Sequence, residues 1–167
     1  MATESAPEHA ASLGDITLGI LKTLRPHQWV KNLFVLAPLF FSQQFYDVGK
    51  LVDGLAAALL FCLGSGTVYM VNDIFDVEED RKHPVKQYRP IPSGQLPVRV
   101  ARIAAGVLGA GVVTASWVIH PWLAATIGGY MVMNLAYSVS LKKVAFVDVT
   151  IIATGFVLRI LAGKFAA

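Results

Sequence analysis

Apolar residues along this chain occur in long blocks that are separated by short polar segments. Blocks of about 17 to 25 mainly apolar residues have the length of a helix that crosses a bilayer. The pattern therefore predicts an all-α fold, a multi-span transmembrane helical bundle. Pro38 is expected to kink the first crossing. The predicted spans cover residues 28–45, 51–71, 100–119, 123–140 and 146–167.

A shorter helix is predicted ahead of the first span. Ser12, followed three residues later by Asp15, is typical of a helix start. The apolar residues that recur at helical spacing, and so predict an amphipathic helix at the membrane surface, are Leu13, Ile16, Ile20 and Leu24. The predicted organisation is a disordered cytoplasmic tail at 1–11, the interfacial helix at 12–25, and a transmembrane domain at 26–167 that is truncated at its C-terminus.

The composition supports a membrane protein. Hydrophobic residues make up 55% of the chain, charged residues 15%, and the mean hydropathy is +0.58. A soluble domain would carry about 25% charged residues. The single cysteine, Cys62, excludes an internal disulfide, and we expect it only to pack. The four histidines lack metal-ligand spacing, so a zinc site is not expected.

Lysine and arginine residues orient the predicted spans. They gather at the start of the first span, between the second and third spans, and between the fourth and fifth. The opposite ends of the spans carry only Lys50 and Lys164. We therefore expect an integral membrane protein with its N-terminus and the acidic residues at 72–80 in the cytoplasm.

Small residues within the spans predict close helix packing rather than a phosphate-binding loop, because no Lys-Ser/Thr pair follows the glycines. These residues are Gly64, Ser65, Gly66, Gly106, Gly109, Ala110, Gly128 and Gly129.

An acidic run, NDIFDVEED at 72–80, follows directly on the second predicted span. Carboxylates are unfavourable at a helix C-terminus because the helix dipole is negative there, so a cation is expected. On a helix Asp73, Asp76 and Asp80 form one stripe, and Asn72 flanks it. Oxygen ligands of this kind suit Mg²⁺. The alternative is a solvated helix end whose acids pair with the bases at 81–86.

Basic residues follow the acidic run in the segment DRKHPVKQYRPIPSG. Lys86 and Arg89 are candidates to hold phosphate oxygens, while the acids hold the metal. In the first span, Lys31 beside Asn32 is also well placed for a phosphate.

Two charges lie inside the fifth span, Asp148 and Arg159. Charges there are costly in lipid, so we expect both to face a central cavity.

The motif N-D-x-x-D-x-x-x-D at 72–80 resembles the first aspartate-rich motif of the UbiA superfamily of intramembrane prenyltransferases. The segments LRPHQWVKNLFVLAPLFF, DRKHPVKQYRPIPSG and YSVSLKKVAFVDV resemble its decaprenyl-phosphate phosphoribosyltransferase branch. The resemblance covers residues 24–159. It implies a helical bundle in a bacterial cell membrane, with its active site on the cytoplasmic side in a membrane-open cavity where Mg²⁺ binds a substrate diphosphate. It also implies transfer of 5-phosphoribosyl from phosphoribosyl diphosphate to a polyprenyl phosphate, releasing diphosphate, for cell-wall arabinan precursors.

The resemblance assigns roles to individual residues. Asp73 and Asp76 would be catalytic, and Asn72 and Asp80 would join them as metal ligands. The residues that would bind substrate are Lys31, Asn32, Lys86, Arg89, Tyr137, Lys142, Asp148 and Arg159. The implied partners are the two substrates and the bilayer, with no nucleic acid; a homo-oligomer is left open.

The chain departs from the superfamily pattern in length. Members have about nine spans and a second acidic motif, whereas five spans are predicted here, so we expect a fragment or a truncated form. Two other functions stay open: an aromatic prenyltransferase of quinone synthesis, for which the aspartates would serve equally, and an inactive membrane fragment.

Overall fold

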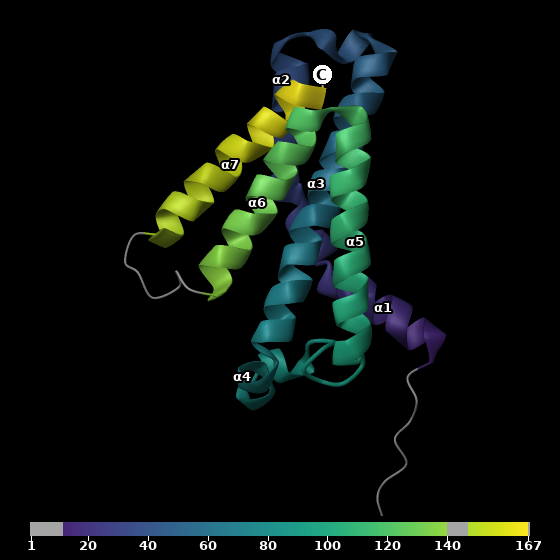
Figure 1. Cartoon of the computed structure of the whole chain (residues 1–167), viewed down its shortest axis with the longest axis vertical. Helices are drawn as coiled ribbons and strands as arrows, with labels where there is room; N and C mark the ends of the chain where they lie inside the picture. Colours follow the sequence, from purple (N-terminus) through teal and green to yellow (C-terminus); the bar gives the residue numbers. More distant parts are fainter. Residues whose placement is uncertain (1–11, 140–146, 167) are drawn as a thin grey trace, which may run out of the picture.

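A computed structural model of the chain describes residues 12–139 and 147–166. Four long helices form its body, and each packs against the next along the chain. Figure 1 shows α5 and α6 running side by side, with α3 behind them and α7 on the far side of α6. These helices are α3 (Val48–Phe75), α5 (Val98–Ile119), α6 (Pro121–Val139) and α7 (Val147–Ala166).

Three of the described helices, α3, α5 and α7, are long and apolar enough to cross a membrane. The 28 residues of α3 exceed the prediction of 51–71 at both ends. Its start is capped by the side chain of Asp47, which accepts hydrogen bonds from the backbone of Gly49 and Lys50. At 1.5 Å per residue α3 is about 42 Å long, whereas the hydrocarbon core of a bilayer is about 30 Å thick. One end of α3 can therefore lie outside the hydrocarbon core.

The predicted first span is not one continuous α-helix. Its residues form the 3₁₀ helix η1 (Pro26–Leu36) and the short helix α2 (Ala37–Phe41). Pro38 starts α2 instead of kinking a longer helix, because proline has no N–H to donate but suits a first helical turn. Long 3₁₀ segments are uncommon. Here η1 packs against both α3 and α7, so tertiary contacts support it.

The amphipathic helix α1 (Leu13–Thr23) has the predicted start. The Ser12 hydroxyl accepts a hydrogen bond from the Asp15 backbone, and the Asp15 carboxylate accepts one from the Ser12 backbone. Ile16 and Ile20 are partly buried and pack against an apolar cluster of the protein that includes Leu24. The large apolar residues that α1 exposes are Leu13, Leu18 and Leu21. Placement of this face at the membrane surface stays a prediction.

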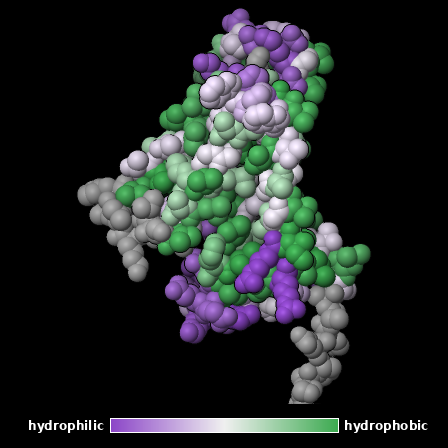
Figure 2. Space-filling view, viewed as in Figure 1, coloured by the Kyte–Doolittle hydropathy of each residue, from purple (hydrophilic) through white to green (hydrophobic). Residues whose placement is uncertain are grey.

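The polar segment after α3 contains α4 (Val77–Lys82) and η3 (Lys86–Tyr88), and both lie at the end of the bundle where α5 begins (Figure 1). The short helix η2 (Gln44–Tyr46) lies at the opposite end. Figure 2 shows hydrophilic side chains gathered at these two ends and mainly apolar side chains between them. This distribution suits a protein whose middle lies in lipid.

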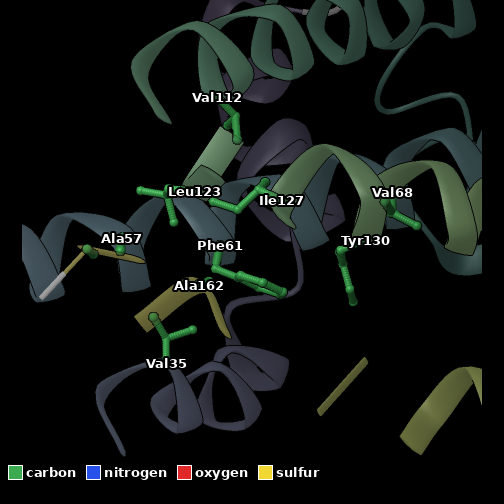
Figure 3. Packing of buried hydrophobic residues seen from close by; sticks show 10 residues of the cluster. Val35, Ala57, Phe61, Val68, Val112, Leu123, Ile127, Tyr130 and Ala162 are labelled. Carbon is green, nitrogen blue, oxygen red and sulfur yellow. The ribbon is translucent and has the colours of Figure 1, made fainter. Parts of the chain in front are cut away.

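The interior of the bundle is an apolar cluster around Phe61, with Leu123 and Ile127 from α6 and Ala162 from α7 (Figure 3). Small residues permit the close approach. A side chain at Gly64 would press against Ile127, and one at Gly66 against Leu24. The packing prediction is thus confirmed for those two glycines, whereas a Cβ at Gly106, Gly128 or Gly129 would contact no atom within 4 Å.

Candidate functional site

The acidic run forms a turn between two helices. The helix α3 ends at Phe75, and Asp76, with φ −89° and ψ 6°, separates it from α4. The predicted stripe on a single helix was therefore wrong in detail. Asp73 lies in the last turn of α3 and Asp80 in α4, and both side chains are almost fully buried. Burial of two carboxylates requires positively charged partners.

Three basic side chains supply these partners. The Arg25 guanidinium lies 2.6 Å from Asp73, and Arg89 joins Asp73 at 3.1 Å to Asp80 at 2.8 Å. The Lys86 ammonium lies 3.4 Å from the other oxygen of Asp80. We call these five residues the ion cluster. Three cations against two carboxylates leave it with a net positive charge of one, which favours an approaching phosphate.

A polar pocket of about 330 Å³ lies between η1, α3, α6 and α7. Its polar lining residues are Lys31, Tyr69, Tyr130, Asn134 and Arg159. The pocket borders the ion cluster at Tyr69, because the guanidinium of Arg25 stacks 4.7 Å above the Tyr69 ring. The two polar regions therefore meet at the contact between Arg25 and Tyr69.

The buried cation of this pocket is Arg159, which is 7% exposed. Its Nε donates to the Asn32 Oδ1 at 2.9 Å, and an Nη donates to the Tyr130 hydroxyl at 3.3 Å. Its guanidinium also lies 5.1–5.4 Å from three aromatic rings, those of Phe61, Tyr130 and Phe156. Within residues 12–139 and 147–166, no carboxylate forms an ion pair with Arg159. A buried arginine fixed in this way, beside a cavity, is suited to bind an anion.

A family model, described as the UbiA prenyltransferase family, matches residues 33–167. The chain belongs to the UbiA prenyltransferase family. The resemblance predicted from the aspartate-rich motif is thereby confirmed, as is the all-α membrane fold.

Named relatives of this UbiA family chain agree with the predicted branch. The chain is 37% identical over 171 residues to a decaprenyl-phosphate phosphoribosyltransferase of Mycolicibacterium smegmatis. The aligned region covers 99% of this chain and 53% of the relative. It is 40% identical over 153 residues to the protein of the same name in Corynebacterium glutamicum, and this aligned region covers 89% of the chain and 46% of the relative. The chain thus spans about half the length of these relatives.

The fold also matches a solved UbiA homologue from Archaeoglobus fulgidus bound to GPP and Mg²⁺. The TM-score is 0.70 at 21% identity, over 89% of this chain and 54% of that one. At this identity the match establishes the shared UbiA fold.

The residues at the end of α3 suit Mg²⁺ by their donor type. Asn72 Oδ1 is buried and has no hydrogen-bond partner among the described residues. An unpaired buried acceptor costs about 1–3 kcal/mol, so a cation at this oxygen would be stabilising. A complete cluster is not assembled: in the described part of the chain, no three carboxylate, histidine or cysteine side chains could together hold a metal. Arg89 lies between Asp73 and Asp80, and this separates the predicted ligands.

The predicted substrate-binding residues fall into different surroundings. Lys31 is exposed and lines the pocket, and its contact with a phosphate stays a prediction. Asn32 is buried, and its amide also donates to Ser65 at 3.1 Å, so it holds Arg159 in place rather than lining the pocket. Tyr137 is partly buried near the end of α6 and does not line the pocket.

The two charges of the fifth predicted span also differ. Arg159 faces the pocket as expected. The expectation for Asp148 was wrong, because this residue is exposed at the first turn of α7, where its carboxylate accepts from the Val149 backbone. Lys142 lies outside the described residues.

Sequence reasoning missed Arg25, Tyr69, Tyr130 and Asn134. Arg25 was taken as a flanking charge, but it adopts a left-handed backbone conformation, φ 51°, that directs it toward Asp73. One signal could have found it. Both arginines that bind Asp73 directly precede a proline, in LRP and YRP, where proline restricts the preceding backbone.

Proposed function

We propose that the protein transfers 5-phosphoribosyl from phosphoribosyl diphosphate to a polyprenyl phosphate and releases diphosphate, as a step toward cell-wall arabinan precursors. The observation that carries the proposal is the net positive ion cluster at Asp73, which contacts, through Arg25 and Tyr69, the pocket that holds the buried cation Arg159. The printed names of the relatives support this choice of substrates.

The donor would bind at the ion cluster. Phosphoribosyl diphosphate is soluble and highly anionic, and the cluster lies at the end of α3 that we expect in the cytoplasm. Arg25, Lys86 and Arg89 would exchange part of their pairing with the aspartates for diphosphate oxygens. Asn72, Asp73, Asp76 and Asp80 would hold Mg²⁺, which when bound would neutralise charge on the diphosphate. With Mg²⁺ bound the site would be more positive, which would stabilise the anionic leaving group.

The acceptor phosphate would bind in the pocket between Lys31 and Arg159. Lys31 lies at the exposed edge, where a lipid phosphate would arrive, and Arg159 lies inside, held by Asn32 and Tyr130. In the transfer, a phosphate oxygen of the acceptor forms a bond to ribose C1, and the bond from C1 to the diphosphate oxygen breaks. The bonding electrons leave with the diphosphate. The acceptor is already an anion, so the chain needs no general base.

Charge stabilisation would supply most of the catalysis. As the C1–O bond lengthens, positive charge develops on the ribose and negative charge on the departing diphosphate. The basic side chains of the ion cluster are already positioned by Asp73 and Asp80, so little reorganisation is needed at that moment. Arg159 is similarly fixed before the acceptor arrives.

The test supplies membranes that contain the protein with decaprenyl phosphate and radiolabelled phosphoribosyl diphosphate. Label should enter the lipid fraction, and EDTA should stop the transfer. Arg159→Gln should lower the rate at least tenfold by raising the KM for the lipid, whereas Lys164→Gln, an exposed lysine of the same helix, should not.

The alternative enzymes give different results. Consumption of a prenyl diphosphate with an aromatic acceptor, while the ribosyl label stays aqueous, would establish the aromatic prenyltransferase instead. Absence of either transfer from correctly inserted protein would favour the inactive fragment.

A further inference from the structure

A second, mainly apolar groove lies between α3, α5 and α6, and none of the residues assigned to the proposed reaction site lines it. Its volume is about 710 Å³. Val71 and Ile74 of α3, Ala105 and Gly106 of α5, and Leu135 of α6 contribute to its walls. The groove shares no lining residue with the pocket that contains Arg159. Two of these helices, α3 and α5, are long and apolar enough to cross a membrane, so we expect the groove to lie at the level of the bilayer.

One strongly basic side chain, that of Arg102, lines this apolar groove. Arg102 is exposed, and the exposed Arg99 precedes it by one turn of α5. Within residues 12–139 and 147–166, neither arginine forms an ion pair with a carboxylate. Both lie in the first turns of α5, at the end of the bundle that carries the ion cluster (Figure 1). By the orientation predicted from the charges, this end meets the cytoplasmic leaflet.

We propose that this groove binds an anionic phospholipid of the cytoplasmic leaflet, with one acyl chain in the apolar groove and the phosphate at Arg102. Basic sites between transmembrane helices on the cytoplasmic side are suited to anionic headgroups. Arg102 can lay its alkyl stem along the groove and direct its guanidinium to the headgroup. The volume falls within the roughly 300–1,000 Å³ of sites for drug-sized molecules. One acyl chain is of that size, whereas a long polyprenyl chain exceeds it.

Gly106 provides a way to fill the groove without disturbing the helices. A Cβ placed on Gly106 would meet no atom within 4 Å, so a larger side chain can extend into the groove. Gly111 lies on the same helix, has equally open surroundings and does not line the groove. Gly106→Leu and Gly111→Leu therefore form a matched pair. Both replace glycine with leucine on α5, but only the leucine at position 106 would fill the groove.

The experiment uses the purified chain in detergent and measures bound lipid by native mass spectrometry. Phosphatidylglycerol and phosphatidylcholine with the same acyl chains are titrated separately. We expect phosphatidylglycerol to bind more tightly, and Gly106→Leu to weaken it at least tenfold while Gly111→Leu does not. Arg102→Gln should weaken it about fivefold, the effect of one basic residue near an anionic surface. Arg102→Lys should retain most of the affinity, because the charge remains.

Three outcomes would overturn the proposal. The first is equal affinity for phosphatidylglycerol and phosphatidylcholine, which would show that Arg102 does not select an anionic headgroup. The second is equal binding to the two leucine variants, which would place the lipid elsewhere. The third is that decaprenyl phosphate binds more tightly than phosphatidylglycerol and loses affinity on Gly106→Leu, which would make the groove a site for the isoprenoid. Thermal unfolding of each variant checks that its fold is intact. Failure of the phosphoribosyl transfer assay would leave this site unaffected.

Discussion

Replacement of Arg89 by methionine should destabilise the folded protein, because this arginine joins two buried carboxylates. Its guanidinium lies 3.1 Å from Asp73 and 2.8 Å from Asp80, whose side chains are 4% and 2% exposed. Removing one partner of a fully buried ion pair costs about 3–5 kcal/mol. Two observations reduce this figure. The Arg89 side chain is 32% exposed, and each carboxylate keeps a second base, Arg25 or Lys86.

We therefore expect the free energy of unfolding to fall by about 1–2 kcal/mol. For a chain of this size that corresponds to a decrease in Tm of roughly 2–8 °C. The assay is thermal unfolding of the purified protein in one detergent. Arg81→Met is the control, since Arg81 pairs with the exposed Glu78 and should change Tm by less than about 2 °C.

A double-mutant cycle tests the physical cause. Arg89→Met leaves the buried Asp80 carboxylate with one basic partner fewer, and Asp80→Asn removes that carboxylate's charge. The double variant should therefore lose less free energy of unfolding than the sum of the losses in the two single variants. We expect a coupling of about 1 kcal/mol or more between them. Equal decreases in Tm for Arg89→Met and Arg81→Met, or additive effects in the cycle, would refute the reasoning that the ion cluster is a buried network.

Three further predictions address topology, chemistry and packing. An impermeant thiol reagent added to intact cells should label Lys50→Cys and not Ser93→Cys; the reverse pattern would invert the orientation. Asp73→Asn should lower phosphoribosyl transfer at least a hundredfold, since an amide brings no charge to a cation, and near-normal turnover in membranes would exclude Asp73 from the site. Gly163→Ala should lower the Tm, with a cost of about 1–3 kcal/mol, because its Cβ would collide with the carbonyl of Val35. The control Gly128→Ala, in open surroundings, should leave the Tm unchanged or raise it slightly.

The candidate site was only partly predictable from the sequence. Asp73, Asp80, Lys86 and Arg89 were identified because they lie close together in the chain, and the structure brings all four into the ion cluster. Their partner Arg25 lies 48 residues from Asp73 and was missed. Its approach depends on a left-handed residue before Pro26 and on the packing of η1 against α3. Neither feature leaves a periodic pattern in the sequence.

The first predicted span and α1 also show that the sequence pattern of a single segment does not determine how that segment packs. Apolar content alone predicted one span at 28–45, but its residues form η1 and α2 instead of a single α-helix, and η1 packs against both α3 and α7. For α1 the spacing correctly predicted a helix and its cap. The spacing did not indicate that Ile16 and Ile20 pack against the apolar cluster that contains Leu96.

The sequence by itself determined the class of protein, the four long helices and the acidic motif of the UbiA family. Apolar length, helix caps and motif spacing are local properties, so they can be read from neighbouring residues; α5, for example, begins two residues before its predicted start. Only the tertiary structure decided which charges meet. Arg159 lies 127 residues from Asn32, and the groove at Arg102 is formed by three separate helices. Such contacts depend on how side chains from distant segments fill the same space, and a linear pattern of residue types does not contain that information.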